Sequence, residues 1–204
     1  MSDMKAIYDY IDAHADEFVA DLQAFVQQPS VSAQDIGLRD CAALIRDQMH
    51  RDGLPAEFHE LEQGPPVVYG EVSSKSTKTL LCYSHYDVQP PEPTEAWTYG
   101  GPWSGAVVDG VLYGRGATDN KSGVLAFNKA AKAFLAVRGE VPVGLKLLIE
   151  GEEEIGSPNL GPWAKKNADM LEADGMHCLD GSLEIGVEVP DVSLGLKSVL
   201  FVEL

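Results

Sequence analysis

Cysteine is scarce in this sequence. Its three cysteines, Cys41, Cys82 and Cys178, are far apart and form no CxxC pair. An odd number of widely spaced cysteines argues against a disulfide framework and fits a reducing compartment, so we expect a cytoplasmic protein. Cys82 lies within an apolar run, where a free cysteine is usually a small buried hydrophobic residue.

Basic side chains are also few. The 15 Lys and Arg residues face 32 Asp and Glu residues, which gives a net charge of −17. Nucleic acids and anionic membranes are bound through basic patches, so the composition argues against both as partners. The excess of carboxylates has two explanations, a well-solvated surface or acidic groups that surround cations, and composition does not separate them.

Long apolar runs are absent. No stretch approaches the roughly 20 apolar residues of a membrane span, and the N-terminal stretch MSDMKAIYDYIDAHADEF has no apolar segment typical of a signal peptide. Hydrophobic residues still make up 45% of the 204 residues, which is enough for a sizeable core. This length suits one large domain, or one domain and a piece of another.

The hydrophobic pattern alternates between two periods. A helical period predicts helices at residues 3–27, 35–51, 121–137 and 159–171. Short apolar runs predict strands at residues 56–61, 67–72, 79–84, 143–149 and 175–179, with a hairpin at 107–113 around an Asp-Gly turn. Strands that alternate with helices predict an α/β fold with a largely parallel or mixed central sheet sandwiched by helices.

The stretch TLLCYSHYDVQP, residues 79–90, is the first candidate for chemistry. His85 and Asp87 are two residues apart at a strand end, so both side chains can face one site. A carboxylate beside a histidine can hold its second ring nitrogen and fix the tautomer that binds a metal. On its own, such a pair is more often an ordinary hydrogen bond at a strand end.

Three further acidic groups follow apolar or glycine-rich segments: Asp119, the glutamates of residues 150–154, and Asp180. In a parallel sheet such segment ends meet at one edge. One histidine with several carboxylates suits Zn²⁺ or Mn²⁺, and two ions that share a carboxylate activate a water for hydrolysis. Each group also has a simpler explanation, a helix N-cap for Asp119 and a solvated acidic loop for the glutamates. The metal hypothesis rests on their coincidence.

The motifs SHYDVQP, YGRGATDNKSG, EGEEEIGS and LD, in that order, resemble the M20 family of metallopeptidases. The YDVQP motif is similar to that of the dipeptidase branch of the family. The resemblance implies a zinc-peptidase-like catalytic domain over residues 1–190, and the start of a lid and dimerisation domain at residues 191–204. It also implies metal-dependent hydrolysis of peptide bonds in dipeptides or short peptides.

The same resemblance implies a role for each candidate residue. Glu153 would be the general base that activates a water, and Asp87 would orient His85. The implied metal ligands are His85 and Asp180 for the first ion, Glu154 for the second, and Asp119 as the bridge. Glu152 stands where the family often has an apolar residue, which leaves the register of the two acids open by one position.

The implied cofactors are two divalent ions, with Zn²⁺ first and Mn²⁺ or Co²⁺ as alternatives. The implied partners are a small peptide substrate and, in the full-length protein, a second copy of the chain. Members of the family are considerably longer and supply a histidine to the second ion from a later segment. The histidines outside the motifs are poor substitutes for it, and we expect His177 to be a packing residue: His14, His50, His59 and His177.

The sequence ends inside an apolar run, so we expect the front part of a longer protein that is weakly active or inactive alone. Two other functions stay open. One is an amidohydrolase that removes acyl groups from N-acyl amino acids. The other is a non-catalytic protein that retains the fold, against which the presence of Glu153 argues.

Overall fold

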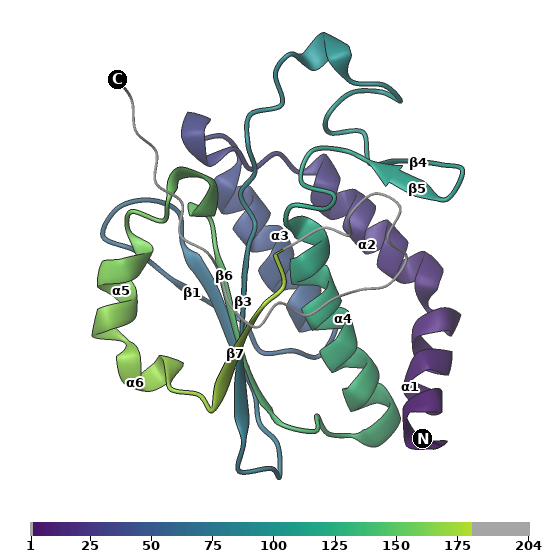
Figure 1. Ribbon diagram of the computed structural model, residues 1–204, viewed down its shortest axis with the longest axis vertical. Coiled ribbons are helices and arrows are strands. Elements are labelled where there is room, and N and C mark those ends of the chain that lie inside the picture. Colours follow the sequence, from purple (N-terminus) through teal and green to yellow (C-terminus); the bar gives the residue numbers. More distant parts are fainter. Residues whose placement is uncertain (1, 181–204) are drawn as a thin grey trace.

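A computed structural model describes residues 2–180 (Figure 1). Its centre is a five-stranded sheet in the order β1-β2-β6-β3-β7. The strands are β1 (Glu57–His59), β2 (Val67–Val72), β3 (Thr79–His85), β6 (Gly144–Glu150) and β7 (Gly175–Cys178). β3 runs parallel to β6 and β7, whereas β2 is antiparallel to β1 and β6. The sheet is therefore mixed, and its parallel half contains the strands that precede the candidate residues.

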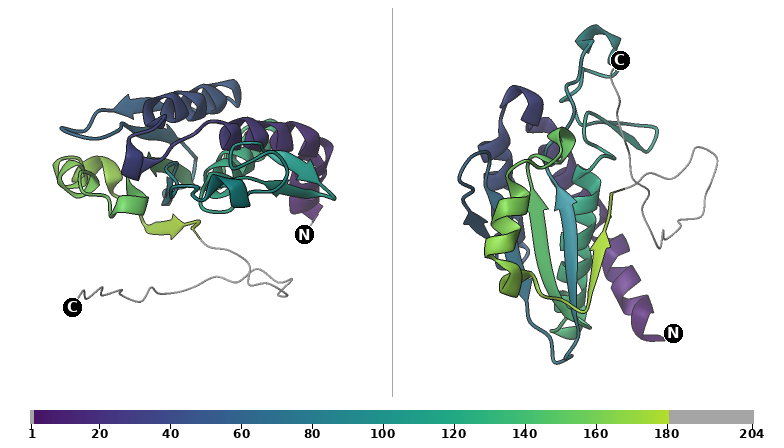
Figure 2. Two further views of the ribbon diagram at one scale, coloured as in Figure 1. Left: turned by 90° about the horizontal axis from the view of Figure 1, so that it is seen from above. Right: turned by 60° about the vertical axis from the view of Figure 1, so that its left-hand side comes forward.

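Helices cover both faces of the sheet (Figures 1 and 2). The first face carries α2 (Ala15–Gln27), α3 (Leu38–Arg51) and α4 (Lys121–Arg138), and α1 (Ser2–Ala13) packs against α4. The second face carries α5 (Leu160–Lys166) and α6 (Ala168–Leu171). The predicted α/β sandwich is confirmed.

Alternation along each strand divides the core in two. One set of strand residues packs with α2, α3 and α4, and it includes Val68, Cys82, Leu147 and Ile149. Their neighbours along the chain point the other way, toward Trp163 of α5, and these are Val67, Tyr69, Leu81 and Leu148. Because the strands are apolar on both faces, the sheet is buried on both sides.

Two predicted helices are each divided in the structure. The helix predicted at residues 3–27 breaks at His14, whose φ of −112° is not helical and whose Nδ1 lies 2.7 Å from the carbonyl oxygen of Tyr10. The helix predicted at residues 159–171 breaks at Asn167, whose side-chain amide donates to the carbonyl of Trp163 at 2.8 Å. Both side chains bond the backbone four residues back, which competes with regular helix geometry.

The predicted hairpin at residues 107–113 is present as β4 (Ala106–Val108) and β5 (Val111–Tyr113). Asp109 and Gly110 both have positive φ, 50° and 81°, as a two-residue hairpin turn requires. The long loop before β4 is tied to α2, because Gln23 donates to the Gly105 carbonyl at 2.9 Å and Gln27 to the Ser104 carbonyl at 3.0 Å.

A buried ion network joins α2, α3 and α4. The ammonium group of Lys129 in α4 lies 2.5 Å from a carboxylate oxygen of Asp21 and 2.5 Å from one of Asp52, and all three side chains are buried. Lys132 approaches the other oxygen of Asp52 at 2.8 Å. Paired in this way, the charges avoid the large cost of an isolated buried ion.

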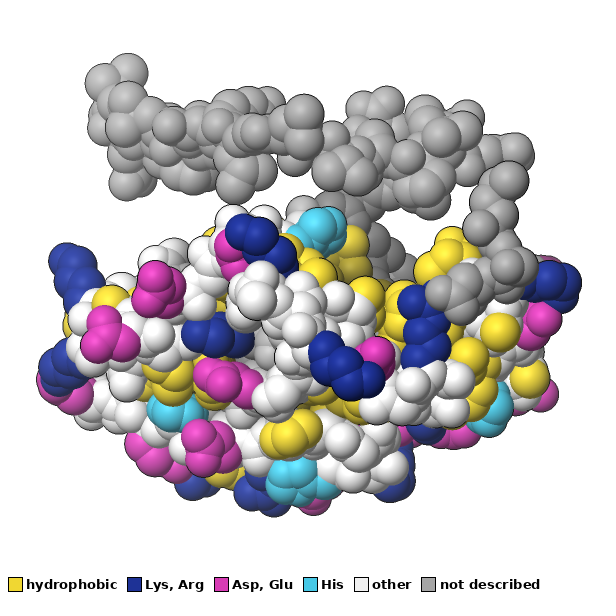
Figure 3. All heavy atoms as spheres, turned by 90° about the horizontal axis from the view of Figure 1, so that it is seen from below, with side chains coloured by type: hydrophobic (Ala, Val, Ile, Leu, Met, Phe, Trp, Pro, Cys, Tyr) yellow, Lys and Arg dark blue, Asp and Glu magenta, His cyan; other side chains and the backbone are white. Residues whose placement is uncertain are grey.

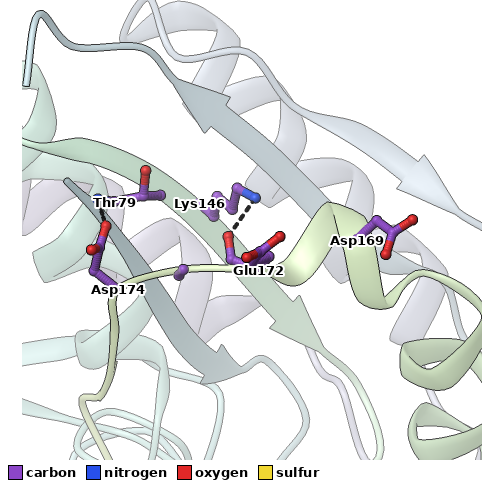
Figure 4. A pocket seen from close by; sticks show the side chains of 6 residues that line it. Thr79, Lys146, Asp169, Glu172 and Asp174 are labelled. Carbon is purple, nitrogen blue, oxygen red and sulfur yellow. Dashed lines mark hydrogen bonds between the residues drawn. The ribbon is translucent and has the colours of Figure 1, made fainter. Parts of the chain in front are cut away.

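A shallow pocket at the amino-terminal end of the parallel strands is lined by hydrogen-bonded polar groups (Figure 4). Lys146 donates to the carbonyl of Glu172 at 2.7 Å, and the amide of Thr79 donates to Asp174 at 2.9 Å. Thr79 and His85 are the two ends of β3, about 20 Å apart at the usual rise of a strand. This pocket is therefore remote from the candidate residues.

The surface seen from below carries acidic and basic side chains interspersed (Figure 3). None of the helices in residues 2–180 has the length and apolar character needed to cross a bilayer. The predicted start of a second domain, residues 191–204, lies outside the described residues, as does the end of the predicted catalytic domain, residues 181–190.

Candidate metal centre

The register of the parallel strands brings the candidate residues together. His85 at the end of β3 pairs with Glu150 at the end of β6, and Tyr83 pairs with Cys178 at the end of β7. Asp180 follows Cys178 by two residues, which brings it level with His85. The carboxyl ends of three parallel strands thus meet at one edge, as the sequence pattern predicts.

Three of the predicted ligands form one cluster. The Nε2 atom of His85 lies 3.2 Å from Asp119 Oδ1 and 3.6 Å from Asp180 Oδ2. Ligand atoms of all three residues lie within 4.8 Å of one another. His85 is fully buried, and its Nε2 has no hydrogen-bond partner in the described part of the chain. A buried, unbonded imidazole nitrogen that faces two carboxylates fits a divalent cation with N and O ligands about 2 Å away.

Asp87 contacts the other ring nitrogen of the same histidine. Nδ1 of His85 lies 3.0 Å from the Asp87 carbonyl oxygen and 3.3 Å from its Oδ1. A proton on Nδ1 can be donated to Asp87, which leaves Nε2 unprotonated for a metal. The buried carboxylate of Asp87 also accepts hydrogen bonds from the backbone N–H groups of Glu153 and Glu154, each at 3.1 Å. The sequence did not predict this second role.

Asp119 ends the glycine-rich segment before α4. The helix begins at Lys121 with Asn120 at the N-cap position, so Asp119 is not the N-cap. Its side chain is 64% exposed and approaches His85. The peptide between Asp119 and Asn120 is cis. Lys121 is fully buried and donates to the carbonyls of Phe25 and Gln28 at 2.9 and 2.6 Å, which anchors this turn to the end of α2.

The four glutamates of residues 150–154 separate into two pairs. Glu150 is buried and accepts the hydroxyls of Tyr83 and Ser157, each at 2.6 Å. Glu152 is also buried and accepts the side-chain amide of Asn159 at 2.9 Å. These two side chains are held by other parts of the fold and do not join the cluster around His85.

Glu153 and Glu154, the other pair, lie in the 3₁₀ turn η3 (Glu153–Ile155). Glu153 Oε2 is 3.9 Å from His85 Nε2, which makes it the glutamate beside the cluster. Glu154 Oε2 accepts the side-chain amide of Gln89 at 2.8 Å. The sequence left open whether the two acids of the site are Glu152 and Glu153 or Glu153 and Glu154. In the structure Glu153 and Glu154 lie on the side of the site, and Glu152 does not.

The acidic surroundings shift the pKa values of the site. Burial raises the pKa of both Glu153 and Glu154, and neighbouring carboxylates raise them further. Burial alone would lower the pKa of His85, but the carboxylates of Asp180 and Asp87 outweigh it and raise that pKa to about 11. The metal-free site therefore holds a proton where a cation would bind.

The four histidines outside the motifs lie elsewhere. His177 packs edge-on against the ring of Phe127 at 5.5 Å, as expected of a packing residue. His14 contacts Tyr10, His50 contacts the Ala56 carbonyl, and His59 lies against Trp163. In the described residues the cluster thus has one imidazole, from His85, and the positions predicted for a second ion, Asp119 and Glu154, have none.

Comparison with known proteins places this chain in a family. The Beta-Ala-His dipeptidase of Homo sapiens is 38% identical over 186 residues, which are 82% of this chain and 36% of that protein. The Cys-Gly metallodipeptidase dug1 of Schizosaccharomyces pombe is 32% identical and covers 96% of this chain and 44% of its own length. The chain therefore spans well under half of these relatives.

The fold agrees with the sequence comparison. The crystal structure of human carnosine dipeptidase 1 superposes with a TM-score of 0.80 at 36% identity, over 87% of this chain and 41% of that one. The family model described as peptidase family M20/M25/M40 matches residues 81–194, more than half of the sequence and the part that contains every candidate site residue. The chain belongs to peptidase family M20/M25/M40.

Proposed function

We propose that the protein to which this chain belongs hydrolyses peptide bonds in dipeptides or short peptides with a centre of two divalent metal ions. The observation that carries the proposal is the buried, unbonded Nε2 of His85, which faces Asp119 and Asp180 with Glu153 at 3.9 Å. The dipeptidases among the similar proteins support the substrate class.

Each side chain of the site would have a separate role in such a reaction. Asp119 would bridge the ions, His85 and Asp180 would hold the first, and Glu154 would hold the second. Bound divalent ions polarise a scissile carbonyl and lower the pKa of a shared water. Glu153 would accept a proton from that water and pass it to the leaving amine. Burial raises the pKa of its carboxyl, which favours the acceptance of a proton.

Three further properties belong to the proposal. We expect Zn²⁺ as the native metal, with Mn²⁺ or Co²⁺ as alternatives, because the donor set mixes one imidazole with carboxylates. We also expect a homodimer for the full-length protein and a cytoplasmic location. The chain alone should be weakly active or inactive, because the positions proposed for the second ion include no imidazole among residues 2–180.

Metal titration tests the centre. Zn²⁺ and Mn²⁺ are titrated into the metal-free chain and into the His85→Ala variant, with His50→Ala as the matched control, since His50 bonds a backbone carbonyl away from the cluster. We expect tight binding that His85→Ala abolishes and His50→Ala leaves intact. Binding that survives His85→Ala would contradict the proposed centre.

A substrate panel tests the reaction. Dipeptides and N-acyl amino acids are offered to the metal-loaded full-length protein, and released amino acids are measured. Faster turnover of dipeptides supports the proposal. Preference for N-acyl amino acids would make the protein a deacylase of the same family, and metal binding without any turnover would favour a non-catalytic role.

A further inference from the structure

The side-chain amide of Gln89 forms two hydrogen bonds with Glu154. Its Nε2 donates to the Glu154 carboxylate oxygen Oε2 at 2.8 Å and to the Glu154 backbone carbonyl at 3.1 Å. The two protons of one amide thus join the side chain and the main chain of the same residue. In the described part of the chain, no other group donates a hydrogen bond to that carboxylate.

The backbone around Gln89 is held firmly, although its side chain is exposed. Val88 is fully buried and its N–H donates to the Ser30 carbonyl at 2.9 Å. Pro90 follows, and its ring restricts the preceding residue to extended conformations. The amide is therefore presented from a fixed position, so less conformational entropy is lost when it binds Glu154.

Gln89 continues a pattern that begins at the metal cluster. His85, Asp87 and Gln89 alternate with Tyr86 and Val88, which are fully buried in the core. The three alternating side chains reach, in turn, the candidate ion, the backbone amides of the acidic turn, and the carboxylate of Glu154. One extended segment thereby sets the position of the turn relative to the ligands.

We infer that Gln89 is a positioning residue for the second metal ion, because it occupies Glu154 Oε2 and leaves Oε1 as the ligand atom. This inference rests on the proposed two-ion centre and deepens it. An amide donor also favours the charged form of the carboxylate, which is the form that binds a cation. The hydrogen bonds of the Gln89 side chain within the described residues go to Glu154, so the binding of the first ion should depend little on it.

The test is the variant Gln89→Leu, which keeps the size of the side chain and removes the donor. Gln34→Leu is the matched control, because Gln34 is an exposed glutamine whose amide donates to the carboxylate of Glu92 at 3.0 Å and not to a proposed metal ligand. Mn²⁺ and Zn²⁺ are titrated calorimetrically into each metal-free full-length variant, and the melting temperature is recorded. The same titration is repeated in a Glu154→Ala background.

We expect two binding steps in the unmodified full-length protein. Gln89→Leu should weaken the second step 10- to 100-fold, the usual effect of losing a group that orients a metal ligand, and change the first less than twofold. Gln34→Leu should change neither. In the Glu154→Ala background, Gln89→Leu should have no further effect, because there is no carboxylate left to orient.

Other results would overturn the inference in separable ways. Two steps that Gln89→Leu leaves unchanged would refute the role of Gln89 and leave the two-ion centre standing. Equal weakening of both steps, or a lowered melting temperature that accounts for the loss, would show a general structural role. A single binding step in the unmodified full-length protein would refute the role of Gln89 together with the two-ion centre.

Discussion

Removal of the Asp87 carboxylate should destabilise the metal-free fold strongly. The side chain is fully buried, accepts two backbone N–H groups at 3.1 Å and pairs with the imidazole of His85 at 3.3 Å. Each buried donor left without an acceptor costs about 1–3 kcal/mol. The loss of one partner of a buried ion pair costs about 3–5 kcal/mol in total. These losses overlap, so we expect Asp87→Ala to lower the free energy of unfolding by about 3–5 kcal/mol.

Asp87→Asn separates the two contributions. Its one oxygen can still accept an N–H group, while the charge and the second acceptor are lost, so we expect about half the effect. Urea unfolding of the metal-free chain at pH 7, followed by circular dichroism, measures both variants. The exposed Asp12, changed to alanine, is the control and should stay within about 0.5 kcal/mol. A loss below 1 kcal/mol for Asp87→Ala would refute the reasoning.

Three further predictions follow from the same structure. Glu153→Gln should retain metal and lower kcat by about 100- to 10,000-fold in the full-length protein, as loss of a general base does, measured by steady-state kinetics beside metal analysis. Metal affinity should rise about tenfold per pH unit between pH 7 and 9, with release of one proton, because the pKa of His85 in the folded state is raised from 6.5 to about 11 and the ion must displace the proton on the ring. Calorimetry in buffers of different ionisation enthalpy detects that proton. An affinity independent of pH would contradict the prediction. Lys129→Met should lower the free energy of unfolding by about 1–3 kcal/mol, because Asp21 and Asp52 would lose their shared partner while Arg51 and Lys132 still pair with them. An unchanged urea midpoint would show that Lys129 adds no stability to the network.

The strands could be predicted well because their apolar runs are short, dense and bounded by turn residues. β2, β3 and β6 lie within a residue or so of their predicted ends, and the Asp109-Gly110 turn gave the hairpin. The helix breaks at His14 and Asn167 could not be predicted, since the apolar period continues across both. They depend on a side chain that bonds the preceding turn, which periodicity does not report.

The site was predictable where it depends on strand ends and not where it depends on distant contacts. His85 and Asp180 meet because parallel strands place their carboxyl ends together, and Asp119 joins them from the turn before α4. The structural role of Glu150 and Glu152 could not be predicted from the sequence. It depends on hydrogen bonds from Tyr83, Ser157 and Asn159, which the fold brings near. Four glutamates within five residues gave no sign that two of them are structural.

If Asp180 binds an ion as proposed, the edge of the sheet would depend on that ion. β7 has four residues and one hydrogen-bonded neighbour, β3, among the described strands, and Met176 in it is 59% exposed. A cation held by Asp180 and His85 would connect the end of β7 to the end of β3. Such a link stabilises the folded state by RT ln(1 + L/Kd), where L is the concentration of free ion. Chelation would then first loosen a strand, seen as faster amide hydrogen exchange in β7 than in β6, before the rest of the domain unfolds.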